Sequence, residues 1–142
     1  MLAQELSELL GSVVDLYLRA HGYHWNVEGE DFGQYHALFE AIYSDIYESI
    51  DPIAENVRKL GEFAPFKLET LKSTSVLEDS RVAPRAKDMA NDLLLANEKV
   101  VSELKRIFRV ANDADEQGIA NFLAERIDKH QKWSWQLTAS TK

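Results

Sequence analysis

Residues 32–60, FGQYHALFEAIYSDIYESIDPIAENVRKL, show helical patterning along their whole length. Apolar side chains recur every three or four positions, which places them on one face of an α-helix. This stripe consists of Leu38, Phe39, Ile42, Tyr43, Ile46, Ile50, Ile53 and Val57. Gly61 follows as a C′ residue and Pro65 lies just beyond it, the usual order at a helix end. The stretch therefore predicts one long helix.

Pro52 lies inside this predicted helix. Proline lacks a backbone N–H and clashes with the preceding turn, at a usual cost of about 3 kcal/mol in a helix interior. The helix must either kink near Glu48 or break into two. Because the apolar spacing resumes in phase at Ile53 and Val57, the sequence favours a kink.

Three other stretches carry the same helical periodicity. The first runs over residues 2–27. Another runs over 84–110, where Pro84 suits the first helical position. The last begins after the loop at 112–115, which contains candidate N-cap residues, and ends at about Leu137.

A connector of about twenty residues, Glu62 to Val82, joins the second and third long helices, and such long connections usually carry structure or function. Phe66 to Leu71 could form a short helix within it. Four long helices with one long crossover and two tight connections predict an all-α, ferritin-like four-helix bundle. The length suits one domain over residues 1–142.

The composition excludes several kinds of chemistry. The chain has no cysteine, which removes disulfides, thiolate zinc sites, iron–sulfur clusters and thiol catalysis. No apolar run approaches the roughly 20 residues that span a bilayer, and no signal segment opens the chain. We therefore expect a cytoplasmic protein without a membrane partner.

The net charge of −8 is unevenly distributed. Residues 1–57 hold eleven of the 24 acidic residues and only one of the 16 basic ones, Arg19, so the remainder carries 13 acids and 15 bases. This acidic part would repel nucleic acid and attract cations. A solvated acidic face remains the alternative interpretation.

Three of the four histidines, His21, His24 and His36, fall within sixteen residues. His24 and His36 flank the turn between the first two predicted helices, so on antiparallel neighbours their side chains stand at similar heights. His36 shares a helix face with Glu40, four residues later. Imidazole with carboxylate suits iron, manganese or zinc, although each histidine could instead be a hydrogen-bonded core residue.

Asp51 and Glu55, a second pair of acids four residues apart, lie further along the same predicted helix. At about 1.5 Å per residue, Asp51 lies roughly 22 Å from His36, too far to share a metal bound at about 2 Å. Either two unrelated half-sites exist, or a symmetric dimer brings His24 and His36 of one chain against Asp51 and Glu55 of the other.

Ordinary ferritin-like di-iron sites use Glu-x-x-His pairs inside one bundle. The sequence has no Glu-x-x-His, because the residues three positions before its histidines are Leu18, His21, Gly33 and Ile127. We therefore do not expect a di-iron centre within the bundle, and we expect any metal site outside its core.

Several of these residues resemble a family signature. The chain is similar to Dps proteins, the mini-ferritins named for DNA protection in starved cells, over essentially its whole length. The resemblance rests on His24-Trp25-Asn26-Val27, Gly29, Phe32, His36, Phe39, Asp51-x-x-Ala54-Glu55 and Leu60-Gly61.

This resemblance implies a hollow shell of twelve identical subunits with ferroxidase activity. Such proteins oxidise Fe(II) at the two-fold interfaces, typically with hydrogen peroxide, and store ferric oxide inside, which limits oxidative damage. Carried over by position, the metal ligands would be His24 and His36 from one subunit and Asp51 and Glu55 from its neighbour. Zinc could substitute for iron at such a site.

Other positions refine what the resemblance implies. Trp25 would resemble the aromatic residue that intercepts stray oxidising equivalents. Glu40 stands where many relatives have an aspartate, and its longer arm could still reach a metal or its water. Asn56 replaces a common arginine, and Asn121 stands where relatives often have an acid at the three-fold pore.

Family members that coat DNA commonly use a lysine-rich tail. This sequence has no Lys or Arg before Arg19 and only Lys142 at its other end, so we do not expect direct DNA binding. Two alternatives stay open: a DNA-compacting shell, and a ferritin-like protein that binds metal without turnover.

Overall fold

The computed structural model describes residues 1–79 and 85–142, and five helices make up its regular structure there. They are α1 (Leu2–Asn26), α2 (Phe32–Lys59), α3 (Leu68–Thr74), α4 (Ala86–Asp113) and α5 (Gln117–Ser140). Four long helices with a short one in the long connector confirm the predicted all-α, ferritin-like four-helix bundle.

The ends of the helices differ from the predicted ones by a few residues. The short connector helix begins at Leu68 rather than Phe66, and α4 and α5 each extend about one turn beyond their predicted ends. Helix α2 is continuous across Pro52, so the alternative of two separate helices is wrong. The expected first helical position, Pro84, lies outside the described residues, and Arg85 is the N-cap of α4.

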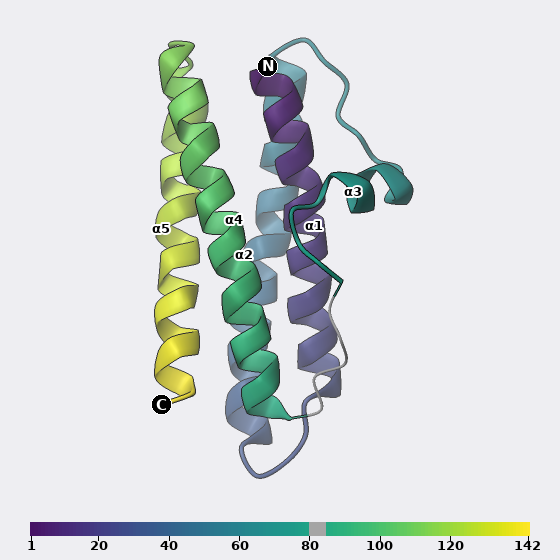
Figure 1. Cartoon of the computed structure of the whole chain (residues 1–142), viewed down its shortest axis with the longest axis vertical. Coiled ribbons are helices and arrows are strands. Elements are labelled where there is room, and N and C mark those ends of the chain that lie inside the picture. The colour runs from purple at the N-terminus through teal and green to yellow at the C-terminus, as the bar shows by residue number, and fades with distance from the viewer. Residues whose placement is uncertain (80–84) are drawn as a thin grey trace.

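The bundle consists of two antiparallel hairpins, α1–α2 and α4–α5 (Figure 1). The described part of the connector, residues 60–79, runs along the outside of the bundle, and α2 and α4 run in the same direction. The chain termini consequently lie at opposite ends. Among the described residues, none of the helices is both long and apolar enough to cross a lipid bilayer.

The short helix α3 packs on α1 at Gly11. A Cβ atom built there would overlap the carbonyl oxygen of Leu71 and would come within 2.5 Å of Thr74 Oγ1. Glycine is therefore the residue that allows the backbone of α3 to approach α1. Nearby, the Ser12 hydroxyl accepts a hydrogen bond from the Val76 amide at 3.0 Å, which holds the segment after α3 to the same helix.

The inner faces of the four long helices form one apolar core, and its largest fully buried side chains come from all four. They are Leu6, Leu9, Leu16, Phe39, Ile42, Ile46, Ile53, Leu93, Leu104, Ile107, Leu123 and Leu137. The predicted stripe on residues 32–60 is largely confirmed, because Phe39, Ile42, Ile46, Ile53 and Val57 are buried.

An ion pair between buried Arg126 and half-buried Asp45 interrupts this core. Arg126 on α5 donates two parallel hydrogen bonds to Asp45 on α2, at 2.9 and 2.8 Å, and Trp133 Nε1 donates a third to Asp45 at 2.7 Å. Burial opposes ionisation of Asp45, but the hydrogen bonds from Arg126 and Trp133 outweigh it and lower the pKa of the carboxyl. The aspartate is therefore a charged, fully engaged partner of Arg126.

His130 continues the same network towards α4. Its Nε2 lies 3.2 Å from a guanidinium nitrogen of Arg126, which can only donate, so Nε2 accepts and Nδ1 donates to Asn97 Oδ1 at 2.7 Å. Burial, with the charge of Arg126, lowers the pKa of His130 to about 3. Both ring nitrogens are thus occupied by protein groups, and His130 has no lone pair left for a metal ion.

Candidate metal site at the α1–α2 turn

His24 at the end of α1 and His36 near the start of α2 lie against each other. Residues 27–31 reverse the chain between the two helices, and this short turn sets both histidines at the same level of the hairpin. Their rings stack with centroids 3.7 Å apart and an interplanar angle of 15°. The meeting of these two side chains is therefore confirmed.

Backbone carbonyls fix the orientation of both rings. His24 Nδ1 lies 2.8 Å from the carbonyl oxygen of His36, and His36 Nδ1 lies 2.8 Å from the carbonyl oxygen of His24. Because a carbonyl oxygen only accepts, each Nδ1 carries the hydrogen in these bonds. Each neutral ring therefore keeps its Nε2 lone pair free of these contacts, which is the tautomer that binds a metal through Nε2.

Glu40 brings a carboxylate to the same place. Its Oε1 lies 3.8 Å from His24 Nε2, and its side chain is exposed, so it can move towards a cation without losing a buried contact. Within the described residues, however, no three His, Asp or Glu side chains form a group that could hold a metal ion by themselves.

The structure does not bring Asp51 and Glu55 to the histidines. Both lie towards the other end of α2, on either side of Pro52, and both are exposed. Asp51 follows His36 by fifteen residues of continuous helix, a rise of about 22 Å. In one chain, the two sets of expected ligands therefore lie apart.

Trp25 lies beside the histidine pair but does not stack on it. Its ring is 62% exposed, and its centroid lies 4.3 Å from that of His21. The ring of His21 lies 5.9 Å from that of His24. Burial, followed by the effect of His24, lowers the pKa of His21. Trp25 is therefore connected to the site through His21.

Two aromatic neighbours of the histidines were not foreseen as part of the site. Phe32 stacks on His36 with centroids 4.7 Å apart, and Tyr43 stacks on His21 at 3.8 Å and meets His24 edge-on at 5.1 Å. The sequence signal was present, since Tyr43 lies seven residues after His36 and therefore shares its helix face.

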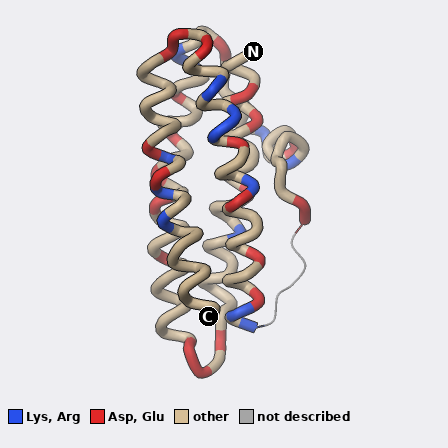
Figure 2. The backbone as a smooth tube through the Cα atoms, turned by 60° about the vertical axis from the view of Figure 1, so that its left-hand side comes forward, with Lys and Arg blue, Asp and Glu red and all other residues tan. Residues whose placement is uncertain are grey.

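Exposed acidic residues lie in the turn next to the histidine pair. Glu28, Glu30 and Asp31 lie in the turn between α1 and α2 and are all exposed. Figure 2 shows them as the acidic tip at one end of the bundle, with no Lys or Arg in the turn itself. This charge distribution attracts cations to the end of the hairpin that carries the histidine pair.

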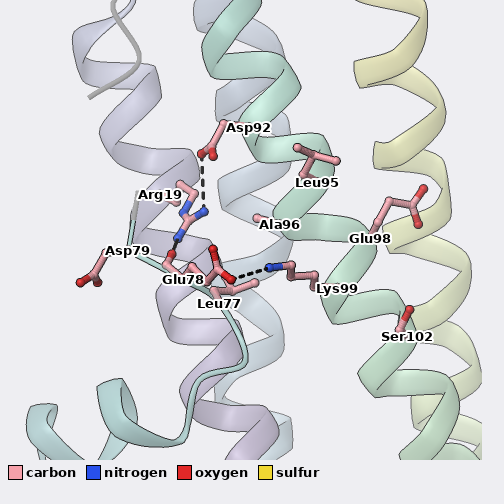
Figure 3. Close-up of a pocket in the computed structure, with 10 residues that line it drawn as sticks. All are labelled: Arg19, Leu77, Glu78, Asp79, Asp92, Leu95, Ala96, Glu98, Lys99 and Ser102. Carbon is pink, nitrogen blue, oxygen red and sulfur yellow. Dashed lines mark hydrogen bonds and ion pairs between the residues drawn. The ribbon is translucent and has the colours of Figure 1, made fainter. Parts of the chain in front are cut away.

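A separate pocket of about 420 Å³ lies between α1, α4 and the segment after α3 (Figure 3). Arg19 donates to the carbonyl oxygen of Glu78 at 2.6 Å and pairs with Asp92 at 3.5 Å, and Lys99 lies 3.8 Å from the Glu78 carboxylate. These charged groups engage one another across the pocket. They hold the connector against the bundle, away from the histidine pair.

Comparison with known proteins agrees with the fold. The family model for the ferritin-like domain matches residues 3–141. The DNA protection during starvation protein of Helicobacter pylori is 28% identical over 135 residues, which cover 94% of each chain.

Solved structures show the same similarity. The Dps protein of Bacillus brevis superposes with a TM-score of 0.94 at 28% identity, covering 99% of this chain and 95% of that one. The Dps protein of Vibrio cholerae O1, described as a member of a broad superfamily of ferritin-like diiron-carboxylate proteins, also gives 0.94 at 25% identity, covering 99% and 89%. The fold is thus that of a ferritin-like protein. Within that superfamily, the chain belongs to the Dps family.

Proposed function

We propose that this protein is a ferroxidase that oxidises Fe(II) with hydrogen peroxide and stores the ferric product inside a hollow shell of twelve subunits. The observation that carries the proposal is the histidine pair, because both Nδ1 atoms are held by backbone carbonyls and both Nε2 atoms are left for a metal. This tautomer control accompanies most metal-binding histidines.

The site is completed by a second copy of the chain. His24 and His36 of one subunit bind Fe(II) together with Asp51 and Glu55 of the other, and a two-fold axis makes two such sites per dimer. Glu40 binds the metal or its water from the histidine side. Imidazole with carboxylate oxygen is a donor set that suits Fe(II), and it accommodates zinc as well.

Iron is the substrate of this reaction. Two Fe(II) ions each give one electron to a molecule of hydrogen peroxide, which takes up two protons and leaves as two molecules of water. The histidines stay neutral and bound while the carboxylates balance the charge of the product. Peroxide and Fe(II) are consumed together, so hydroxyl-radical formation is suppressed and DNA is protected without being touched.

Charge supports this indirect protection. The chain carries a net charge of −8, and residues 1–57 contain a single basic residue, so a shell of these subunits repels the phosphate backbone. Acids around the α1–α2 turn instead attract the cationic substrate. We therefore propose no direct DNA-binding role.

Mixing two inactive variants tests both the chemistry and the shared site. The pair His24→Gln/His36→Gln and the pair Asp51→Asn/Glu55→Gln should each lose peroxide-dependent Fe(II) oxidation, followed by ferric absorbance. After unfolding and co-assembly, half of the dimers contain one of each chain and half of their sites are intact, so about a quarter of the wild-type activity should return.

Asp88→Asn, which changes an exposed acid in the first turn of α4, is the matched control and should keep full activity. If both variant pairs lost activity and the mixture recovered none of it, all ligands would have to lie in one chain. Full activity in both variant pairs would disprove the site, and stoichiometric zinc binding without Fe(II) oxidation would show metal binding without turnover.

A further inference from the structure

Glu103 is buried where α4 packs on α1, and its carboxyl group has no hydrogen-bond partner there. The residue is 4% exposed, and in the described part of the chain neither carboxyl oxygen takes part in a hydrogen bond. A buried carboxyl group without a partner is far more costly when it is ionised than when it is neutral. The fold therefore favours the protonated form of Glu103.

Burial raises the pKa of Glu103 to about 7, and the charges that face it do not reverse this rise. Arg106, three residues further along α4, acts against the rise, but its guanidinium group pairs with Glu5 of α1. Glu8 and Glu5, which face Glu103 from α1, add to the rise. The carboxyl group of Glu103 therefore exchanges its proton near neutral pH.

Ser12 on α1 lies between Glu103 and the connector. Its hydroxyl acts against the rise in the pKa of Glu103, although it falls short of hydrogen-bond geometry. The hydroxyl instead donates to the Glu8 carbonyl oxygen at 3.4 Å and accepts from the Val76 amide at 3.0 Å. The group that holds the connector is therefore also a hydrogen-bond donor within reach of an ionised Glu103.

We propose that Glu103 is a proton-binding group that controls the docking of residues 75–77, the segment after α3, on α1. While Glu103 is protonated, Ser12 keeps its hydroxyl on the Val76 amide. When Glu103 loses its proton, the carboxylate draws the Ser12 hydroxyl across the seam between α1 and α4 or admits water to it, and Val76 loses its acceptor. The proposal is independent of the proposed function, because neither Fe(II) nor an expected metal ligand takes part.

The raised pKa gives the direction of the effect. In the opened seam water reaches the carboxyl group of Glu103, and its pKa returns towards the ordinary 4.5. Docking therefore has its full strength below about pH 4.5, weakens as the pH rises, and is weakest above about pH 7. Between these limits each opening releases one proton, so opening becomes up to about 10-fold more frequent per pH unit.

Other contacts keep the release local. The Ser75 hydroxyl donates to Asp15 at 2.8 Å, and Arg19 donates to the Glu78 carbonyl oxygen at 2.6 Å. Neither hydrogen bond involves Glu103, so both continue to tie the connector to α1 when Val76 is released.

Amide hydrogen exchange at Val76 tests the proposal in the assembled protein. Its protection factor, which corrects for the intrinsic exchange rate, should fall about 10-fold or more between pH 5 and pH 8 in the wild type. Glu103→Gln keeps the size of the side chain but cannot ionise, so it should remove this fall. Glu98→Gln, which changes an exposed acid of the same helix, is the matched control and should behave as wild type. An equal fall in wild type and Glu103→Gln, or no fall in wild type, would overturn the proposal.

Two further readouts separate local release from a general loosening of α1. The Val27 amide donates to the Tyr23 carbonyl oxygen at 3.0 Å at the other end of this helix, so its protection factor should not change with pH. Ser12→Ala removes the acceptor of Val76, so Val76 should exchange fast even at pH 5. A parallel loss of protection at Val27, or a Val76 amide that stays protected in Ser12→Ala, would overturn the coupling through Ser12.

Infrared spectroscopy tests proton binding directly. Exposed Asp and Glu carboxyl groups are ionised at pH 6, because their ordinary pKa values lie at about 4, so the C=O stretch of a protonated carboxyl at this pH should come from Glu103. The band should weaken by pH 8 and be absent in Glu103→Gln. If Glu103 held a metal ion instead, the band would be absent in wild type, and elemental analysis would find one equivalent of metal per chain that Glu103→Gln loses. That result would overturn the proposal.

Discussion

His24 and His36 each direct Nδ1 at the other's backbone carbonyl oxygen, with both distances 2.8 Å. This exchange locks two side chains from two helices into one unit, with the rings stacked 3.7 Å apart. It also decides which nitrogen is available, since Nδ1 is engaged and Nε2 is not. Two Nε2 atoms, the donors of the proposed metal site, are thus positioned together within a single chain.

The histidine pair should bind metal less well when either ring is replaced. We expect His36→Asn to weaken Co(II) or Fe(II) binding about 10-fold or more, because it removes an Nε2 donor and the ring that stacks on His24. Visible absorbance of the Co(II) form measures the affinity. His130→Gln serves as the contrast, since that ring is engaged on both nitrogens, and equal weakening by the two changes would contradict the assignment.

Glu103 on α4 should make the protein more stable at lower pH. It is 4% exposed, neither of its oxygens has a hydrogen-bond partner in the described part of the chain, and burial raises its pKa to about 7. The nearby Ser12 hydroxyl, although it falls short of hydrogen-bond geometry, and the charge of Arg106 act against this rise, whereas Glu8 and Glu5 add to it.

The folded-state pKa of Glu103 exceeds the ordinary value of 4.5, so its stabilising effect is complete below about pH 4.5 and is lost as the pH rises through about 7. Glu103→Gln should therefore raise the free energy of unfolding at pH 8 by up to about 3 kcal/mol, and most of that gain should disappear at pH 5. Urea unfolding at both pH values measures this. Exposed Glu98→Gln should show no such difference, and a pH-independent effect of Glu103→Gln would show that burial does not alter its ionisation.

The ion pair between Asp45 and Arg126 should be sensitive to the loss of one partner. Asp45→Asn leaves the guanidinium of Arg126 buried without a counter-charge, and we expect a loss of about 3–5 kcal/mol in the free energy of unfolding. Replacing both, with Asp45→Leu and Arg126→Met, should recover much of this loss. Denaturant titration gives both values, and a double variant as unstable as the single one would show that charge is not the cause.

Gly11 should be required for the docking of α3. In Gly11→Ala the new methyl group meets the Leu71 carbonyl oxygen and Thr74 Oγ1, so α3 must move away, at a cost of about 1–3 kcal/mol. Amide hydrogen exchange should accelerate in α3 and remain slow in α4 and α5.

Gly22 is the matched control for this substitution, because it lies in the same helix and a Cβ there meets nothing within 4 Å. Gly22→Ala should stabilise α1 by up to about 1 kcal/mol through helix propensity. If Gly11→Ala left exchange in α3 unchanged, the close approach would not control docking.

The sequence predicted the helices well because their signal is local. Apolar spacing marks a helix within its own residues, so α1 and α2 end within a residue or two of their predicted ends. The meeting of His24 and His36 could be predicted because the two residues are close in sequence. They are twelve residues apart, with one turn between them. Tyr43 was assigned only to the apolar stripe, since its contact with His21 depends on how two helices face each other.

By itself, therefore, the sequence determined the helical bundle, the absence of thiol chemistry, the acidic end of the chain and the presence of two histidines beside one turn. Tertiary structure alone decided which histidine nitrogens are free, that Asp45 meets Arg126 and that Glu103 is buried without a well-formed hydrogen bond. Helical periodicity depends on neighbours a few residues away. Tautomers, buried charges and ring contacts depend on atoms that packing brings together from distant parts of the chain.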